Sequence, residues 1–410
     1  MKTWSDKAMF DLARKFFCGL AVVIGMASAQ KLEPWIAERT PALEQAVSHL
    51  PQASPGPLAW DTLGEIERLE LLGIQTQMFS PPRAARALAL LSVALNDTLA
   101  LLGEAGAERN VALAYAAQEV MLYLHPTFPN LKDGVRETVA DIRAKAEGAG
   151  VAKEVLQGSA RVGFLVGRQV VDFARKDGYS HQAIPQYPPA APGVWVLPLG
   201  RPAAEPGWGQ LTPIGIAKDQ LAEASPPPAW DSPEYEQERK LFWEEQKRLD
   251  DKGREIADKW AGDPGTVTPA GLWQELAVRM LRDKASSPEA AVNVLASLNV
   301  AMHDAFIACW KAKFTYYTAR PNQWVSTFDK TWKPYLRTPR FPAYPSGHST
   351  VSGAAARVLE HYFPGEATLF EGMAQEASYS RIIAGIHWFV DGKNGLDLGR
   401  KVAEQVLKGR

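Results

Sequence analysis

The sequence predicts an all-α protein built from two related helical bundles that pack together. Most of the chain has the period of amphipathic helices, strand-like runs are nearly absent, and a segment of one half is echoed in the other. The 410 residues suffice for two ordinary domains, and 46% hydrophobic with 22% charged residues is usual for a globular protein. A formal net charge of −1 gives no indication that nucleic acid or an anionic membrane is a partner.

Residues 1–29 have the pattern of a secretory signal peptide. An apolar run, FFCGLAVVIGM, is followed by Ala-Ser-Ala before Gln30 and preceded by Lys2, Lys7, Arg14 and Lys15. We expect cleavage after Ala29, which predicts a secreted or periplasmic protein. The alternative is an ordinary N-terminal helix or a retained anchor.

The mature chain would contain one cysteine and no membrane span. Cys18 lies in the signal, which leaves Cys309 as an expected buried apolar residue without a disulfide partner. No later segment offers about 20 uncharged apolar residues. The longest candidate, residues 84–102, contains Arg86 and Asp97. We therefore expect no integral membrane spans.

Helical periodicity covers two stretches separated by a belt rich in Pro and Trp. Residues 179–232 hold eleven of the thirty prolines and three tryptophans, which predicts an irregular segment packed on the surface. The expected domains are the signal 1–29, an N-terminal bundle 30–178 without catalytic motifs, the belt 179–232, and a C-terminal bundle 233–410 with the site. Helices are expected over 82–102, 108–125, 134–147, 151–176, 233–258, 270–282, 288–316, 347–361, 366–384 and 388–408.

Two echoes indicate an old duplication. SPPRAARALALLSVALNDT, from Ser80, aligns without gaps to SPEAAVNVLASLNVAMHDA, from Ser287, and pairs Asp97 with Asp304. Gly-Arg-x-Val occurs at Gly167 and again at Gly399.

Three segments of the second half predict a binding site for an oxyanion. They are Lys313 with Arg320-Pro321, then Pro345-Ser346-Gly347-His348, then Ser380-Arg381 with His387 and Asp391, all within 79 residues. Arg presents a planar fork to tetrahedral oxyanions, and Lys a mobile point charge. The PSGH stretch predicts a helix start, where Ser346 and the Gly347 amide would face an anion.

The two histidines of these segments are the candidates for chemistry. His348 lies at the helix start, where it can transfer a proton. His387 and Asp391 are four residues apart and so share a helix face, and the carboxylate would orient the imidazole. Arg381 and His387 can converge only if the helix breaks near Gly385. We therefore expect Arg381 to hold an anion and His387 to bond to its central atom.

These motifs resemble the signature of the type 2 phosphatidic acid phosphatase and vanadium-dependent haloperoxidase superfamily. WKAK at Trp310, FPAYPSGH at Phe341 and SRIIAGIHWFVD at Ser380 resemble fungal vanadium chloroperoxidases over roughly residues 270–405. The resemblance implies that vanadate oxygens are held by Lys313, Arg320, Ser346, Gly347 and Arg381. It also implies that His387 coordinates vanadium, that His348 is the acid–base group, and that Asp391 orients His387.

The resemblance also indicates two candidate residues for a halide site. Trp310 and Phe341 match positions linked to halide in chloroperoxidases, although both could be plain core aromatics. The gap from Arg320 to Ser346 is shorter than in the fungal pattern, and the residue after Lys313 differs. These departures leave the choice of halide open.

Three functions are compatible with these residues. The first is halide oxidation by hydrogen peroxide to hypohalous acid at a His-bound vanadate. The alternative is a phosphomonoesterase that hydrolyses a small phosphate ester through a phosphohistidine, and needs no cofactor. A non-enzymatic oxyanion binder is the third, and it would have no use for His348.

The oligomeric state does not follow from the sequence. Four other histidines are expected to be structural or exposed: His49, His125, His181 and His361. His303, beside Asp304, is expected to support the site from behind its contacting residues or to be structural.

Overall fold

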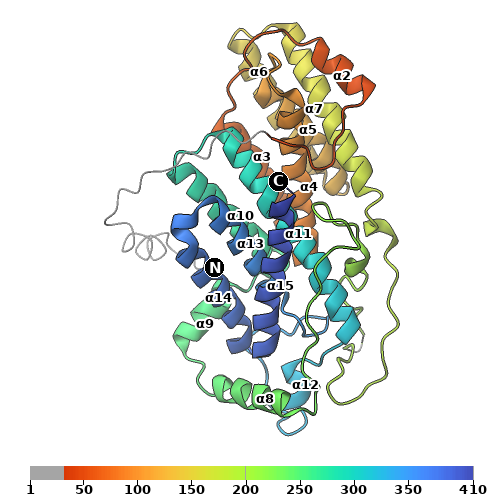
Figure 1. The fold of residues 1–410 in the computed structure, drawn as a ribbon, viewed down its shortest axis with the longest axis vertical. Coiled ribbons are helices and arrows are strands. Elements are labelled where there is room, and N and C mark those ends of the chain that lie inside the picture. Colours follow the sequence, from red (N-terminus) through yellow and green to blue (C-terminus); the bar gives the residue numbers. More distant parts are fainter. Residues whose placement is uncertain (1–31, 199, 410) are drawn as a thin grey trace. The chain divides into compact units, whose positions relative to one another are not determined.

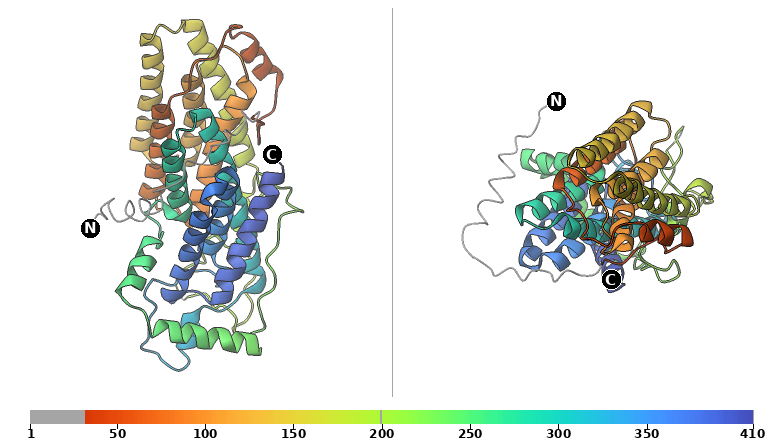
Figure 2. Two further views of the ribbon diagram at one scale, coloured as in Figure 1. Left: turned by 60° about the vertical axis from the view of Figure 1, so that its left-hand side comes forward. Right: turned by 90° about the horizontal axis from the view of Figure 1, so that it is seen from above.

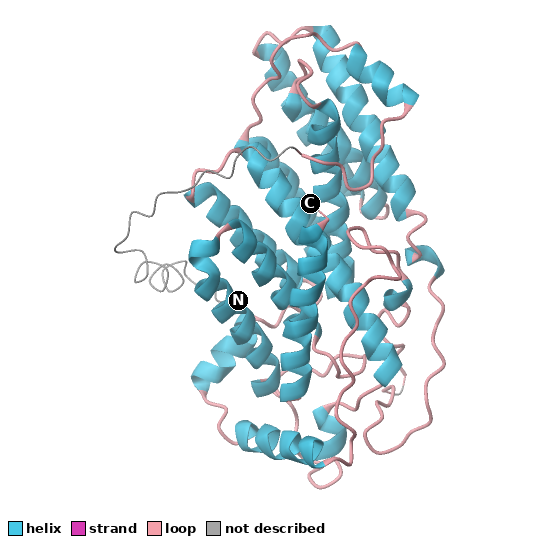
Figure 3. Cartoon of the chain, in the orientation of Figure 1, coloured by secondary structure: helices cyan, strands magenta, loops and turns pink. Residues whose placement is uncertain are grey.

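The computed structural model describes residues 32–198 and 200–409, and these residues form helices and loops without a regular strand (Figures 1 and 3). The all-α prediction is therefore confirmed. The predicted signal peptide lies outside the described residues.

The helices of the first half are α2 to α7. Their bounds are α2 (Pro41–Ser48), α3 (Trp60–Thr76), α4 (Pro81–Leu102), α5 (Arg109–Leu124), α6 (Pro129–Gly148) and α7 (Lys153–Ala174). Two of them, α2 and α3, were not predicted. The first is only eight residues long, and α3 carries Gly64 and Gly73, which weaken a helical pattern.

The helices of the second half are α8 to α15. They are α8 (Pro233–Gln246), α9 (Asp251–Lys259), α10 (Thr268–Asp283), α11 (Pro288–Tyr316), α12 (Pro321–Val325), α13 (Gly347–Tyr362), α14 (Ala367–Ile383) and α15 (Phe389–Lys408). The single helix predicted over 233–258 is wrong. Asp250 accepts a hydrogen bond from Gly253 N–H at 2.7 Å and so begins α9 as a separate helix.

The long helices α4 and α11 form the centre of the fold and pack against each other. Each is long and apolar enough to cross a membrane by length and composition alone, but 94% of the most apolar window of each is buried within the protein. Side chains from both belong to one continuous hydrophobic core. Burial inside the chain explains their apolar composition without a membrane.

The helices around α4 and α11 repeat the same packing. In the first half α5 packs closely on α7, and in the second half α13 packs closely on α15 (Figure 2). Gly167 of α7 faces the carbonyl oxygen of Ala116, and Gly399 of α15 faces that of Thr350. A methyl group at either glycine would collide with the partner backbone. The second sequence echo thus marks a close helix contact in each half.

The first echo also marks equivalent roles. Asp97 of α4 accepts hydrogen bonds from the backbone N–H groups of residues 35–37 at 2.7–2.9 Å. Asp304 of α11 accepts them from Ile214 and Gly215 at 2.9 and 2.8 Å. Each carboxylate fastens an irregular stretch of chain to its central helix. The exact domain boundaries stay a prediction.

The belt between the halves contains the 3₁₀ helices η1 (Tyr179–His181) and η2 (Trp208–Gln210). Trp195 and Trp208 are buried, and η2 packs on α11. The belt therefore packs against α11, the helix that carries Lys313.

Candidate active site

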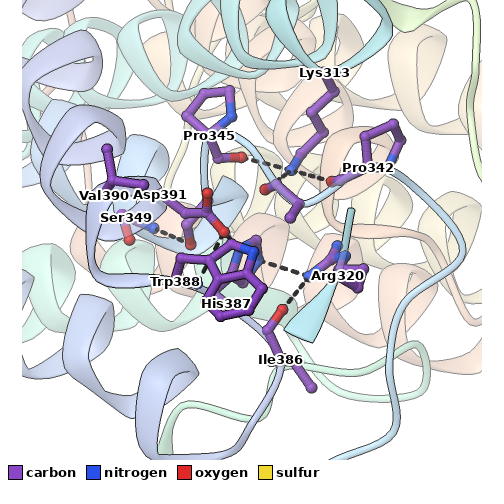
Figure 4. A network of polar contacts seen from close by, with 12 residues as sticks. Lys313, Arg320, Pro342, Pro345, Ser349, Ile386, His387, Trp388, Val390 and Asp391 are labelled. Carbon is purple, nitrogen blue, oxygen red and sulfur yellow. Dashed lines mark hydrogen bonds and ion pairs between the residues drawn. The ribbon is translucent and has the colours of Figure 1, made fainter. Parts of the chain in front are cut away.

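The three predicted segments converge at one end of α11, α13 and α15 (Figure 4). Lys313 lies in the last turn of α11, Arg320 just precedes α12, and Ser346 is the N-cap of α13. Arg381 lies at the end of α14, and His387 directly precedes α15. Ser346 N–H donates to the Asp391 carbonyl at 2.9 Å, which joins α13 to α15.

Gly385 provides the break that brings Arg381 and His387 to the same place. The helix α14 ends at Ile383, and Gly385 has φ +81°, a conformation that favours glycine. A Cβ here would also meet Pro334 at 2.9 Å. The predicted break near Gly385 is thus present.

His387 and Asp391 form a fixed pair. His387 Nδ1 lies 2.9 Å from Asp391 Oδ2, which also accepts Trp388 N–H at 3.0 Å. Both side chains are buried. Burial raises the pKa of Asp391 to about 7, while Trp388 N–H and the charge of Lys313 favour the carboxylate. The carboxylate sets the orientation of the imidazole.

Arg320 determines the tautomer of His387. Its Nη1 lies 3.0 Å from His387 Nε2 and 2.7 Å from the Ile386 carbonyl oxygen. A guanidinium can only donate, so Nε2 accepts through its lone pair and the imidazole proton lies on Nδ1, toward Asp391. Burial, followed by the charge of Arg320, lowers the pKa of His387 well below its ordinary value. His387 is therefore a neutral imidazole with its nucleophilic nitrogen among cations.

Lys313 is fully buried and already hydrogen-bonded. Its Nζ donates to the carbonyl oxygens of Pro342, Ala343 and Pro345 at 2.9, 3.0 and 2.5 Å. Burial lowers its pKa to about 7. An ammonium has three N–H bonds, so Lys313 can donate to an anion only by exchanging one of these carbonyls.

Arg381 is held by the backbone at the end of α9 and just after it. Its Nη2 donates to the Ala257 carbonyl at 3.0 Å and its Nη1 to that of Ala261 at 3.5 Å. Burial lowers the pKa of Arg381 to about 10, so it remains a cation at neutral pH. Sequence reasoning missed Ala257 and Ala261, because backbone carbonyls leave no signature in side-chain motifs.

His348 lies at the start of α13, as predicted, and is partly buried. Its Nε2 is buried, faces Gly262 and makes no hydrogen bond to the residues that the structure describes, while the backbone of Trp260 and Ala261 beside the ring acts to raise its pKa. Burial, followed by the charge of Arg381, lowers the pKa of His348 well below its ordinary value. His348 is thus neutral and can accept a proton.

Trp310 and Phe341 form an aromatic wall beside the cations. Their ring centroids are 4.9 Å apart. Lys313 Nζ and Arg320 Cζ each lie 4.9 Å from the centroid of Phe341. Trp310 is fully buried and Phe341 partly buried. The two residues are therefore both core aromatics and neighbours of the cationic cluster.

The other histidines are placed elsewhere. His303 is buried against Trp208, His125 contacts Glu70, and His49, the C-cap of α2, bonds to the Gln45 carbonyl oxygen. His181 and His361 are exposed. Cys309 is buried and free, as expected, and its Sγ lies 3.6 Å from the Pro345 carbonyl oxygen.

The cluster fits a tetrahedral oxyanion such as vanadate or phosphate. Arg320 Nη2 and His348 Nε2 are buried polar atoms without a partner among residues 32–198 and 200–409. The N–H groups of Gly347 and His348 belong to the first turn of α13 and have no partner within the helix. Three buried cations and a helix N-terminus together form a site that favours an anion.

Comparison with known families and structures agrees with this chemistry. Residues 291–404 match the PAP2 superfamily. The fold is similar to a bacterial vanadium-dependent iodoperoxidase, with a TM-score of 0.73 and 24% identity over 87% of this chain and 98% of that one. These matches confirm the superfamily resemblance.

Two further structures share the fold. An apo and a holo form of a bacterial vanadium-dependent chloroperoxidase match with TM-scores of 0.63 and 0.62, each at 14% identity over 81% of this chain. They cover 94% and 93% of those chains. No curated protein matches the sequence.

Proposed function

We propose that the chain is an exported vanadium-dependent haloperoxidase-like enzyme that oxidises a halide with hydrogen peroxide. The overall reaction is X⁻ + H₂O₂ + H⁺ → HOX + H₂O. The observation that carries the choice is the Phe341–Trp310 wall directly beside Lys313 and Arg320. A weakly hydrated anion such as a halide suits a site with cations on one side and aromatic rings on the other. Export rests on the sequence of residues 1–29.

Vanadate would be held by Lys313, Arg320, Ser346, Gly347 and Arg381 around His387. When bound, it would supply a Lewis acid that activates peroxide toward a halide. The protein contributes fixed positive charge, which stabilises negative charge developing on oxygen. Asp391 keeps the Nε2 lone pair of His387 directed into the cluster.

His348 would handle the proton of the peroxide. Its unpartnered Nε2 is the available base at the site, and burial keeps the imidazole neutral. A base of this kind removes a proton from peroxide as it binds and returns one when hypohalous acid leaves. The partners would thus be hydrogen peroxide and a halide.

A secreted phosphomonoesterase is the second candidate. The PAP2 match over 291–404 and the neutral Nε2 of His387 favour it. His387 would attack phosphorus of a small phosphate ester, and His348 would protonate the leaving group and then activate water. That order requires His348 to begin protonated, which its environment disfavours.

A paired assay separates the two candidates. The mature chain is incubated with orthovanadate and tested for peroxide-dependent halogenation of a dione dye with iodide, bromide and chloride. The vanadate-free protein is tested for hydrolysis of nitrophenyl phosphate. His387→Ala should abolish whichever activity is present, and the exposed His361→Ala serves as the matched control on α13.

Vanadate-dependent halogenation that His387→Ala removes would support the first proposal. Ester hydrolysis inhibited by vanadate, without halogenation, would establish the second. Activity unchanged in His387→Ala would contradict both.

A further inference from the structure

The start of α15 is not capped by its own N-cap residue. That residue is Trp388, whose side chain has no hydrogen-bond acceptor. A helix start needs acceptors for its first N–H groups, and Ser, Thr, Asp or Asn commonly provide one. The start of α15 matters because His387 directly precedes it and Asp391 lies in its first turn.

Glu238 of α8 supplies a missing acceptor. Val390 N–H donates to Glu238 Oε2 at 2.9 Å, across 152 residues of sequence. The Glu238 side chain is partly buried. Burial raises its pKa, while the N–H groups of Val390 and Phe389 act against that shift. A carboxylate at a helix N-terminus also interacts favourably with the helix dipole.

A second residue of α8 lies on the same helix start. Tyr235, three residues before Glu238, packs its ring on Trp388 with a centroid separation of 5.7 Å. Within the part of the chain that the structure describes, the buried hydroxyl of Tyr235 and the buried Oδ1 of Asp391 have no hydrogen-bond partner. Tyr235 and Glu238 are three residues apart, so they share one face of α8, and this face lies against the first turn of α15.

We propose that Glu238 is a positioning residue for the His387–Asp391 pair. Glu238 fixes the first turn of α15 and so holds Asp391 Oδ2 against His387 Nδ1. It touches no reacting atom and acts through the backbone of Val390. The inference rests on the proposed function only in that both candidate reactions use His387.

Four variants test the proposal. Glu238→Ala removes the acceptor, and Glu238→Asp withdraws it by one methylene while keeping the charge. Glu238→Gln keeps a carbonyl oxygen at the same reach and removes the charge. Glu245→Ala is the matched control, because Glu245 lies on the same helix and accepts a hydrogen bond from Tyr379 of α14.

The first readout is the split between kcat and KM. Loss of residues that orient a ligand commonly costs about 10- to 100-fold. We expect Glu238→Ala to lower kcat by that factor, with KM within about threefold of the wild type. The kcat of Glu238→Asp should lie between those of Glu238→Ala and the wild type. The kcat values of Glu238→Gln and Glu245→Ala should stay near that of the wild type. Equal losses in Glu238→Ala and Glu245→Ala would overturn the proposal.

The second readout does not depend on activity. The His387 Nδ1 proton, hydrogen-bonded to Asp391, should give a downfield imidazole resonance in ¹⁵N-histidine-labelled protein. Glu238→Ala and Glu238→Asp should shift or broaden it, whereas Glu238→Gln and Glu245→Ala should not. An unchanged resonance in Glu238→Asp would refute the positioning role, even if the wild type showed neither proposed activity.

Discussion

Variants of Asp391 can separate the role of its hydrogen-bond acceptor from the role of its negative charge. Asp391 Oδ2 accepts two hydrogen bonds, from His387 Nδ1 and from Trp388 N–H. Asp391→Ala leaves both buried donors unpaired, at a cost of about 1–3 kcal/mol each, or roughly 2–6 kcal/mol in the free energy of unfolding. Relief of the buried carboxyl, whose pKa is raised to about 7, offsets part of that cost.

Asp391→Asn should behave differently. Trp388 N–H and His387 Nδ1 meet the same oxygen, Oδ2, so an amide oxygen in that place keeps both hydrogen bonds and the loss of stability should be smaller. The opposite orientation would put NH₂ against Trp388 N–H and would drive the imidazole proton to Nε2, where Arg320 Nη1 is also a donor, and it is therefore disfavoured. Asp391→Asn thus keeps the acceptor and the His387 tautomer but removes the charge. A wrong histidine tautomer costs on the order of 10⁴-fold in kcat in a comparable Asp–His pair, and Asp391→Ala has no acceptor that would prevent it.

The assay is a comparison of the two variants by chemical unfolding and by turnover in whichever reaction the wild type shows. Asp391→Asn should be the more stable variant and should also keep more turnover than Asp391→Ala. Turnover of Asp391→Asn no higher than that of Asp391→Ala would refute the tautomer assignment.

Three other predictions concern single buried groups. Burial raises the pKa of Glu67 from 4.5 to about 8, so its contribution to the free energy of unfolding is most favourable below pH about 4.5 and is lost as pH rises toward 8. Glu67→Gln should therefore raise the free energy of urea unfolding by about 3 kcal/mol at pH 7 and by little at pH 4. Lys313 loses its charge above pH about 7, so sulfate affinity measured by calorimetry should fall roughly tenfold as pH rises from 6 to 8 in the wild type. The affinity should fall less over this range in Lys313→Met, because burial lowers the pKa values of Arg320 and Arg381 only to about 9 and about 10. Gly385→Ala, at φ +81° and against Pro334, should cost about 1–3 kcal/mol of thermal stability and weaken sulfate binding, and equal binding would show that the break is not needed for the site.

The sequence predicted the helices of the core well because their signals are local. Ser287 accepts Ala290 N–H and Pro288 begins α11, so the predicted range 288–316 matches the structure. The sequence did not predict the helix boundary within 233–258. Asp250 is the N-cap of α9, but an N-cap residue inside a run of charged residues has a weak sequence signature. Short helices such as α2 depend on tertiary packing more than on periodicity.

The site shows the same division between local and distant information. Residue types and spacing predicted which side chains come together, including the role of Gly385. They could not predict that Lys313 donates to three carbonyls of residues 342–345, or that Arg381 bonds to the backbone of α9. Nor could they reveal Glu238, whose partner Val390 is 152 residues away and contributes only a backbone N–H.

The most direct test of the account is equilibrium binding of orthovanadate to the mature chain. Wild type, His387→Ala and the control His361→Ala are dialysed against orthovanadate, and the bound vanadium is measured per chain. The account predicts one vanadate per chain in the wild type and in His361→Ala, with affinity at least 100-fold weaker in His387→Ala. Equal binding by His387→Ala would contradict the claim that this imidazole, fixed by Asp391 among three cations, is the centre of the site.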